Sequence, residues 1–202
     1  MSQTSTTISG QKTHKVNITV TEGASFLSSA GTYKISTSST SLANLAVRDL
    51  ITITGSTSNN GTYTVKSVAA DGLSIFVEEQ VTTESADGST DTVIDYVGFV
   101  TDKYKGDGYY SQTDGVHTVA YHVSAGSQTA ANNFNGKIKM QASLATTPTE
   151  DDWFDIENTI FTADLSTKVS SYTFTGNFVW VRAKAFDQTN LTSSVEKILY
   201  NN

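Results

Sequence analysis

Tyr172-Thr-Phe-Thr-Gly-Asn-Phe-Val-Trp-Val-Arg-Ala-Lys-Ala-Phe186 is the stretch that decides the fold class, because it is dense in β-branched and aromatic residues. Such residues fit the pleated, half-buried surface of a sheet. Gly176 and Asn177 divide the stretch, either as a tight turn or as a bulge in one long strand. Beyond them, side chains alternate between two faces. One face carries Val179, Val181, Ala183 and Ala185, and the other carries Phe178, Trp180, Arg182 and Lys184.

The composition of the 202-residue chain favours a folded β protein with polar outer faces. Hydrophobic residues make up 37% and charged residues 16%, and Ser, Thr, Asn and Gly fill the balance. Disordered chains are poor in aromatic residues, whereas aromatic residues reach 10% here and lie in alternating segments. The length suits one large or two small β domains.

Charge and cysteine content exclude several classes of function. The formal net charge of −7 repels phosphate backbones, so we expect no nucleic-acid partner. The absence of cysteine removes disulfides, thiolate nucleophiles and zinc–thiolate sites. No apolar run approaches the roughly 18 residues of a membrane helix, so we expect no membrane partner. Residues 1–10 lack the apolar core of a secretory signal, which predicts synthesis in a cytoplasm.

Short alternating segments with turn signals between them predict an all-β chain of two small antiparallel β-sandwich or barrel domains in tandem. We expect a polar N-terminal arm over residues 1–13, an N-terminal β domain over 14–101 and a C-terminal β-sandwich domain over 109–202. The charged, glycine-bearing segment from Thr101 to Gly108 is the predicted boundary. Strands are predicted at 16–20, 33–36, 50–54, 62–68, 73–78, 92–100, 115–124, 136–145, 153–156 and 195–200.

The cleanest alternation lies between Gly136 and Ala145. We expect Ile138, Met140, Ala142 and Leu144 to point inward, and Lys137, Lys139, Gln141 and Ser143 to point into solvent. A strand with one wet face indicates an antiparallel sheet.

Residues that could support catalysis are few. His117 and His122 lie in one predicted strand at an odd separation, so they face opposite sides and cannot act as a pair. His14 lies near the N-terminal arm. The chain contains no Gly-x-Ser-x-Gly elbow, P-loop or dinucleotide fingerprint. We therefore expect no enzyme activity, no catalytic residues and no cofactor.

Two acidic clusters raise the alternative of a calcium site. The first comprises Glu150, Asp151, Asp152 and Asp155, and the second runs from Asp87 to Asp91. Calcium sites use several oxygen ligands from a flexible loop, but neither cluster matches the EF-hand spacing. We interpret both as solvated acidic loops and expect no bound metal.

Tyrosines and asparagines provide the candidate interface residues. Tyr104, Tyr109 and Tyr110 gather around the predicted boundary, and tyrosine is favoured at interfaces. They could equally pack between the two domains or, with Trp153, stack on sugar rings. Trp153 and Trp180 lie in predicted strands and suit a core. The loops 55–61 and 125–135 add Asn59, Asn60, Asn132 and Asn133; with the arm, these loops are candidates to become ordered on assembly.

The second half of the chain resembles a known class of proteins. Residues 136–156 (Gly-Lys-Ile-Lys-Met-Gln-Ala-Ser-Leu-Ala-Thr-Thr-Pro-Thr-Glu-Asp-Asp-Trp-Phe-Asp-Ile), the stretch 172–186 and the terminal Ile198-Leu-Tyr-Asn201 carry the likeness. Together they resemble the C-terminal β-domain of structural proteins of contractile-tailed bacteriophages of marine bacteria. Asp49 to Val68 resembles a small β module common in phage virion proteins.

The resemblance implies a non-enzymatic virion component: a capsid decoration protein, a neck or collar protein or a tail-associated protein. Its partners would be other virion proteins and copies of itself, and its location the virion. The motifs are structural, so no catalytic residue is implied. The alternative is a carbohydrate-binding module of the virion that recognises host surface glycans.

Overall fold

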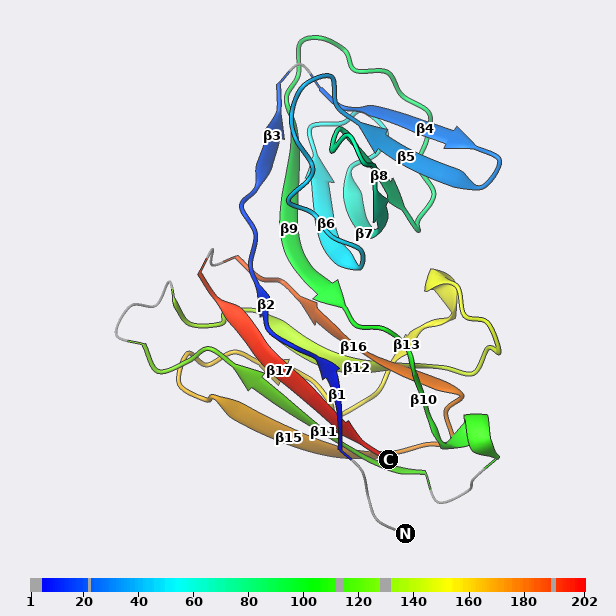
Figure 1. Cartoon of the computed structure of the whole chain (residues 1–202), viewed down its shortest axis with the longest axis vertical. Coiled ribbons are helices and arrows are strands. Elements are labelled where there is room, and N and C mark those ends of the chain that lie inside the picture. The colour runs from blue at the N-terminus through cyan, green and yellow to red at the C-terminus, as the bar shows by residue number, and fades with distance from the viewer. Residues whose placement is uncertain (1–4, 22, 112–114, 128–131, 190–191) are drawn as a thin grey trace. The chain divides into compact units, whose positions relative to one another are not determined.

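The computed structural model describes residues 5–21, 23–111, 115–127, 132–189 and 192–202. The fold is all-β with antiparallel sheets, as predicted, and divides into two compact units (Figure 1). The larger unit combines Met1–His14 with Val100–Asn202, and the smaller unit is Lys15–Phe99. The predicted tandem order is not confirmed, because both ends of the chain contribute to the larger unit. The segment 101–108, predicted as a boundary, lies inside that unit.

The larger unit contains twelve of the named elements. These are β1 (Thr6–Ser9), β2 (Lys12–Thr13), β10 (Tyr104–Lys105), the 3-10 helix η1 (Asp107–Tyr110), β11 (Val116–Val123), β12 (Lys137–Ser143), the 3-10 helix η3 (Glu150–Asp152), β13 (Phe154–Asp155), β14 (Phe161–Thr162), β15 (Val169–Thr175), β16 (Trp180–Phe186) and β17 (Ser194–Asn201).

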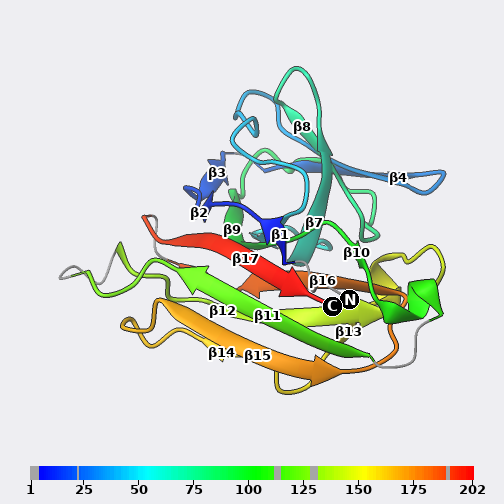
Figure 2. The same ribbon diagram turned by 60° about the horizontal axis from the view of Figure 1, so that its bottom comes forward.

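Two sheets form the larger unit as a sandwich-like fold (Figure 2). The first has the strand order β1-β17-β11-β15, with β2 also paired to β17. In the second, β12 pairs with β16 and with the short β13 and β14, and β10 pairs with β16. Period-two alternation buries one face of each long strand. The fully buried side chains include Val119, Tyr121, Ile138, Met140, Ala142, Val181, Ala183, Ala185 and Ile198.

The stretch 172–186 is divided between the two sheets. Its first part belongs to β15, which pairs with β11, and its second part forms β16, which pairs with β12. Neither a hairpin turn nor a bulge occurs at Gly176 and Asn177, so both interpretations were wrong. A Cβ atom at Gly176 would lie 2.1 Å from the ring of Phe178, which folds back over it. A side chain at position 176 would therefore require the Phe178 ring to move.

The alternation in β12 is confirmed for Ile138, Met140 and Ala142, which are completely buried. Leu144, expected inside, is 63% exposed because β12 ends at Ser143. Gln141 and Ser143, expected in solvent, are buried. The buried amide of Gln141 is satisfied, because its oxygen accepts from Arg182 and its nitrogen donates to Asp155.

The N-terminal segment does not form a separate arm where the structure describes it. Thr6–Ser9 pairs with the terminal strand β17, and Ile8 is buried. Lys12 and Thr13 continue this pairing, with a register shift between Thr7 and Ser9. The strand β17, which the sequence predicts, thus supplies the hydrogen-bonding edge with which the N-terminal residues pair. Residues 1–4 lie outside the described residues.

The smaller unit comprises β3 (Ile18–Val20), β4 (Ser25–Ser29), β5 (Thr32–Ser36), β6 (Asp49–Thr54), β7 (Gly61–Val68), β8 (Ser74–Val77) and β9 (Thr92–Val100), which ends at the unit boundary. The predicted meander of three strands is confirmed as β6-β7-β8. β9 pairs with β6, and β5 pairs with β8. One apolar cluster, which includes Phe26, Ile35, Leu42, Ile51, Ile53 and Ile75, fills this unit.

Candidate interaction site

The short strand β10 and the 3-10 helix η1 carry the three predicted tyrosines and place them beside β16. In β10, Tyr104 pairs with Val181 and Lys105 with Trp180. Gly106 and Gly108 then donate backbone hydrogen bonds to Val179 and Phe178 at 3.0 and 2.9 Å. A Cβ atom would lie 2.5 Å from the Phe178 carbonyl oxygen at the first glycine and 2.8 Å from the Asn177 oxygen at the second. The Gly-Asp-Gly sequence therefore allows η1, and the tyrosines it carries, to lie against the crossing segment.

The side chains around this turn form an aromatic hollow of about 330 Å³. We define the aromatic hollow as the space lined by Thr6, Lys103, Tyr104, Lys105, Tyr110, Trp180, Tyr200 and Asn202. At its rim, the Tyr109 ring lies 5.1 Å from Trp180 and 5.2 Å from Tyr110, measured between centroids. Tyr109 and Tyr110 are 43% and 55% exposed. The rings of Tyr109 and Tyr110 on η1 are thus presented to solvent.

Two lysines place positive charge beside the rings of the aromatic hollow. The Nζ atom of Lys103 lies 4.5 Å from the Trp180 ring centroid, and that of Lys105 lies 4.1 Å from the Tyr109 centroid. These are cation–π distances. Within the described residues, no carboxylate pairs with either lysine, although the chain carries a net charge of −7. The aromatic hollow is therefore suited to a partner that offers negative charge beside apolar surface.

The floor of the hollow contains a phenol that stays protonated. Burial, with a smaller contribution from the charge of Asp107, raises the pKa of Tyr200 well above its ordinary value. Its hydroxyl bonds to Nδ1 of His117 at 2.7 Å. Tyr200 therefore supports the floor and carries no charge at neutral pH.

The sequence indicated the three tyrosines but not the two lysines, and the prediction that Trp180 lies in the core was wrong. Trp180 is only partly buried, and its Nε1 atom donates to the Thr146 carbonyl at 3.0 Å. A signal was present: Lys103 and Lys105 alternate around Tyr104, so on a strand they share one face. Trp153 is also only partly buried, and the guanidinium of Arg182 lies 4.2 Å from its ring centroid.

Asn59, a predicted interface residue, is instead an internal anchor of the smaller unit. Its side chain is buried, donates to the Thr82 carbonyl and to Glu84, and accepts from the Thr82 amide. Glu84 also accepts from Ser56 and from the amides of residues 57 and 58. Asn60 is exposed and accepts from the Ser56 amide. The loop 55–61 is thus held by its own unit, without a partner.

Replacing Glu84 with glutamine is expected to lower the free energy of unfolding by about 1.5–3 kcal/mol, the range for hydrogen bonds to a charged group. The glutamine NH2 group would face donors that the carboxylate now accepts. Burial acts to raise the pKa of Glu84, but hydrogen bonds from Thr57, Ser56, Ser58 and Asn59 outweigh it and lower the pKa. Denaturant titrations of both proteins would measure the difference.

The pH dependence provides the control for Glu84. Because the folded-state pKa is lowered, the contribution is complete above the unfolded pKa of about 4.3 and is lost as pH falls through the folded value. The difference between wild type and Glu84→Gln should therefore shrink below about pH 4. A difference that stays constant down to pH 2 would contradict the role of the ionised carboxylate.

The second asparagine pair also has internal partners. Asn133 is buried and forms two hydrogen bonds with the backbone of Ser127. Asn132 is exposed and accepts from the hydroxyl of Thr192. Residues 128–131 of the predicted loop lie outside the described residues. Of the predicted residues, only Tyr104, Tyr109 and Tyr110 come together.

The histidines do not converge. His117 is completely buried, whereas His122 is partly exposed on the opposite face of β11, which confirms the prediction from their spacing. Burial, and then the charge of Lys197, lowers the pKa of His122. His14, expected near a separate arm, is buried and lies 3.2 Å from the Gln188 carbonyl oxygen.

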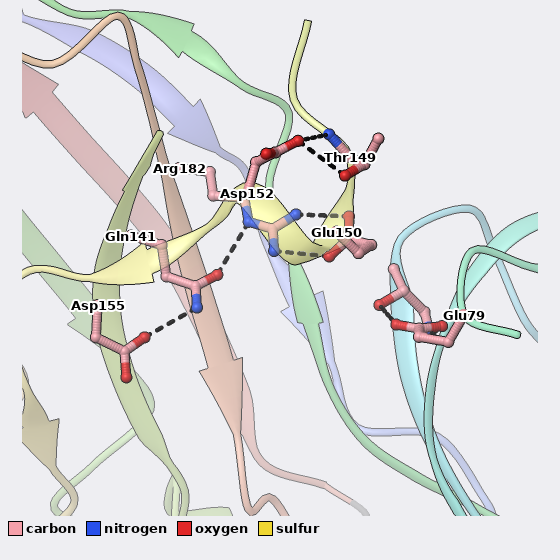
Figure 3. A network of polar contacts seen from close by, with 8 residues as sticks. Glu79, Gln141, Thr149, Glu150, Asp152, Asp155 and Arg182 are labelled. Atoms are coloured by element: carbon pink, nitrogen blue, oxygen red, sulfur yellow. Dashed lines mark hydrogen bonds and ion pairs between the residues drawn. The ribbon is translucent and has the colours of Figure 1, made fainter. Parts of the chain in front are cut away.

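Three residues of the first acidic cluster, Glu150, Asp152 and Asp155, form other contacts (Figure 3). Glu150 forms a two-pronged ion pair with Arg182, and Asp152 caps η3 through the backbone and hydroxyl of Thr149. Asp155 bonds to Gln141 and Lys139. In the second cluster, Asp87 accepts from the amides of residues 89 and 90. No group of three metal-binding side chains occurs among the described residues.

Other hollows lie in the smaller unit. One of about 450 Å³ is lined by Gly31, Thr32, Tyr33, Lys66, Ser67, Phe76 and Val77, and fewer aromatic rings line it than line the aromatic hollow.

No described helix is long and apolar enough to cross a membrane. No known family model matches the chain, and no curated protein matches it.

Proposed function

We propose that this chain is a non-enzymatic structural protein of a bacteriophage particle, a decoration, neck or tail-associated component that binds another virion protein through the aromatic hollow. The observation that carries the proposal is the exposed aromatic and cationic surface of Tyr109, Tyr110, Lys103 and Lys105 on a sandwich-like scaffold. The sequence resemblance described above supplies the class of particle. The buried His117 and the partly exposed His122 lie on opposite faces of β11, which offers no catalytic pair.

The aromatic hollow has the chemistry of an interface centre. Tyrosine and tryptophan offer large contact areas with few rotatable bonds, and they dominate binding energy where water is excluded. Lys103 and Lys105 would attract a carboxylate-bearing segment of the partner and fix its position. We expect the partner to present acidic side chains beside apolar ones, because both lysines already lie against rings and lack carboxylate partners among the described residues.

Particles stripped of the protein would test this assignment by rebinding. Replacing Tyr110 with alanine and Lys105 with glutamate together is expected to weaken binding by at least about 30-fold, since a hot-spot residue contributes 2 kcal/mol or more. Lys197→Glu makes the same charge change at an exposed position on β17 and should bind as wild type does. If wild-type protein fails to rebind, or if the double variant binds normally, the proposal is wrong.

The second candidate function is carbohydrate binding, which three clustered rings also favour. Tyr109, Tyr110 and Trp180 could stack on sugar rings if the lysines moved aside. Trp153, named for this role from the sequence, is already covered by Arg182. A glycan array would decide: hits that disappear in Tyr109→Ala support this candidate, and an array without hits removes it.

A further inference from the structure

We propose that β15 is an assembly edge, which pairs antiparallel with the β15 of a second copy of this chain. β15 is the outermost strand of its sheet, beyond β11 and β17 (Figure 2). Within the described residues, β11 is the only strand that pairs with it, in an unbroken register from Val116 opposite Thr175 to His122 opposite Val169.

Two backbone hydrogen bonds fix which groups of β15 point outward. The Gly176 amide donates to Gly115, and the Val123 amide donates to Lys168, both at 2.9 Å. Because successive residues of a strand direct their N–H and C=O groups to opposite sides, the even-numbered residues of β15 bond to β11. The N–H and C=O groups of the odd-numbered residues therefore face away from β11. These residues are Val169, Ser171, Thr173 and Thr175.

β15 lacks the features that usually protect an edge. Soluble proteins blunt edge strands with charges, proline, bulges, short length or a covering segment. The seven residues Val-Ser-Ser-Tyr-Thr-Phe-Thr contain no charge and no proline, and the register has no shift. By contrast, β4 in the smaller unit is bridged through Phe26 to Glu84, and β1 is short and irregular.

A second copy fits this edge because β15 is complementary to itself. With Tyr172 on a two-fold axis, Ser171 lies opposite Thr173 of the other copy, and Val169 lies opposite Thr175. All four outward residues then form hydrogen-bonded pairs. No charges meet, which matters because each copy carries −7 overall. A two-fold contact of this kind closes as a dimer and leaves the aromatic hollow as a separate surface.

This inference rests on the proposed function, because a virion component is expected to assemble with copies of itself, but its test needs no particle. The first experiment uses the absence of cysteine. In the proposed register, Tyr172 faces Tyr172 of the second copy as a non-hydrogen-bonded pair, with Cα atoms about 4.5 Å apart. That distance permits a disulfide. Tyr172→Cys should therefore cross-link to a dimer on mild oxidation.

Ser170→Cys is the matched control, since it lies on the same strand and the same face. In the proposed register, Ser170 lies opposite Phe174 of the second copy, so the two substituted positions are four residues apart along the strand, about 13 Å. Ser170→Cys should remain uncross-linked. Equal cross-linking of both variants, or of neither, would overturn the proposed pairing.

Sedimentation of the full chain gives an independent measurement. Wild type should show a concentration-dependent dimer, and Thr173→Pro should raise the dimer dissociation constant at least about tenfold, because two copies each lose an outward hydrogen bond. Thr173 bonds outward, so proline leaves the pairing to β11 intact. A melting temperature equal to that of wild type, both measured at a concentration where wild type is monomeric, would show that the variant folds. If wild type stays monomeric, this inference is wrong even if the protein rebinds particles. If wild type dimerises but does not rebind particles, only the proposed function is wrong.

Discussion

Replacing His117 with alanine is expected to lower the free energy of unfolding by about 3–5 kcal/mol, through a cavity in the core and two lost hydrogen bonds. The ring is completely buried and stacks 5.1 Å from Phe174 and 5.8 Å from Tyr200. Nε2 lies 2.9 Å from the Gly176 carbonyl oxygen, which only accepts, so Nε2 carries the proton. In the neutral ring, Nδ1 then accepts from the Tyr200 hydroxyl. Denaturant titration would measure the loss.

Two further variants separate the causes. His117→Phe fills most of the volume but leaves the Gly176 carbonyl and the Tyr200 hydroxyl without their partner, so we expect a loss of about 2–3 kcal/mol. His122→Ala, on the other face of the same strand, should change stability by no more than about 0.5 kcal/mol. If His117→Ala were as mild as His122→Ala, the histidine would not be part of the core.

The sequence predicted the fold class because burial with a period of two is a local property. Side chains alternate between buried and exposed positions along β11, and in β12 as far as Met140, so these positions can be assigned without knowing the partner strand. His117 and His122 could be assigned to opposite faces on this ground alone. The register between distant strands has no such signal, so the pairing of Thr6–Ser9 with β17 could not be predicted.

The crossing at Gly176 shows a second limit. A glycine within a run of strand-forming residues has several local meanings, including a turn and a bulge. Here the ring of Phe178 occupies the space that a Cβ atom would take, and the chain passes from one sheet to the other. That reason is a tertiary contact, which no local pattern contains.

Only part of the candidate site could be predicted, because the rest depends on contacts between residues that are far apart in the sequence. Tyr104, Tyr109 and Tyr110 are close in sequence and could be grouped by composition. Trp180 joins them only because β10 pairs with β16. This pairing places Lys105 opposite Trp180, about seventy-five residues later in the sequence. Asn59 and Asn133 were chosen as polar loop residues, but polar side chains that satisfy buried backbone groups have the same composition as exposed ones.

Replacing Glu150 with alanine is expected to lower the free energy of unfolding by about 3 kcal/mol, because it leaves a buried cation without its partner. The side chain of Arg182 is only 4% exposed and bonds to both carboxylate oxygens of Glu150, at 2.8 and 2.7 Å. Its remaining contacts, Gln141 and the Trp153 ring, carry no negative charge. Thermal and denaturant unfolding would both measure the loss.

The reciprocal variant, Arg182→Met, should lower the free energy of unfolding by less than Glu150→Ala does. This difference tests whether the unpaired buried charge of Arg182 causes the loss. Arg182→Met removes the buried charge and keeps an apolar stem against Trp153, while Glu150, with 24% of its side chain exposed, can be hydrated. We expect a loss of about 1–2 kcal/mol. Adding Glu150→Ala to Arg182→Met should then cost little more, so the two losses are not additive. Asp187→Asn, which removes the exposed pair with Lys137 and suits the positive φ at this position, should cost no more than about 0.5 kcal/mol. Equal losses for Glu150→Ala and Asp187→Asn would mean that burial of Arg182 does not set the strength of the pair.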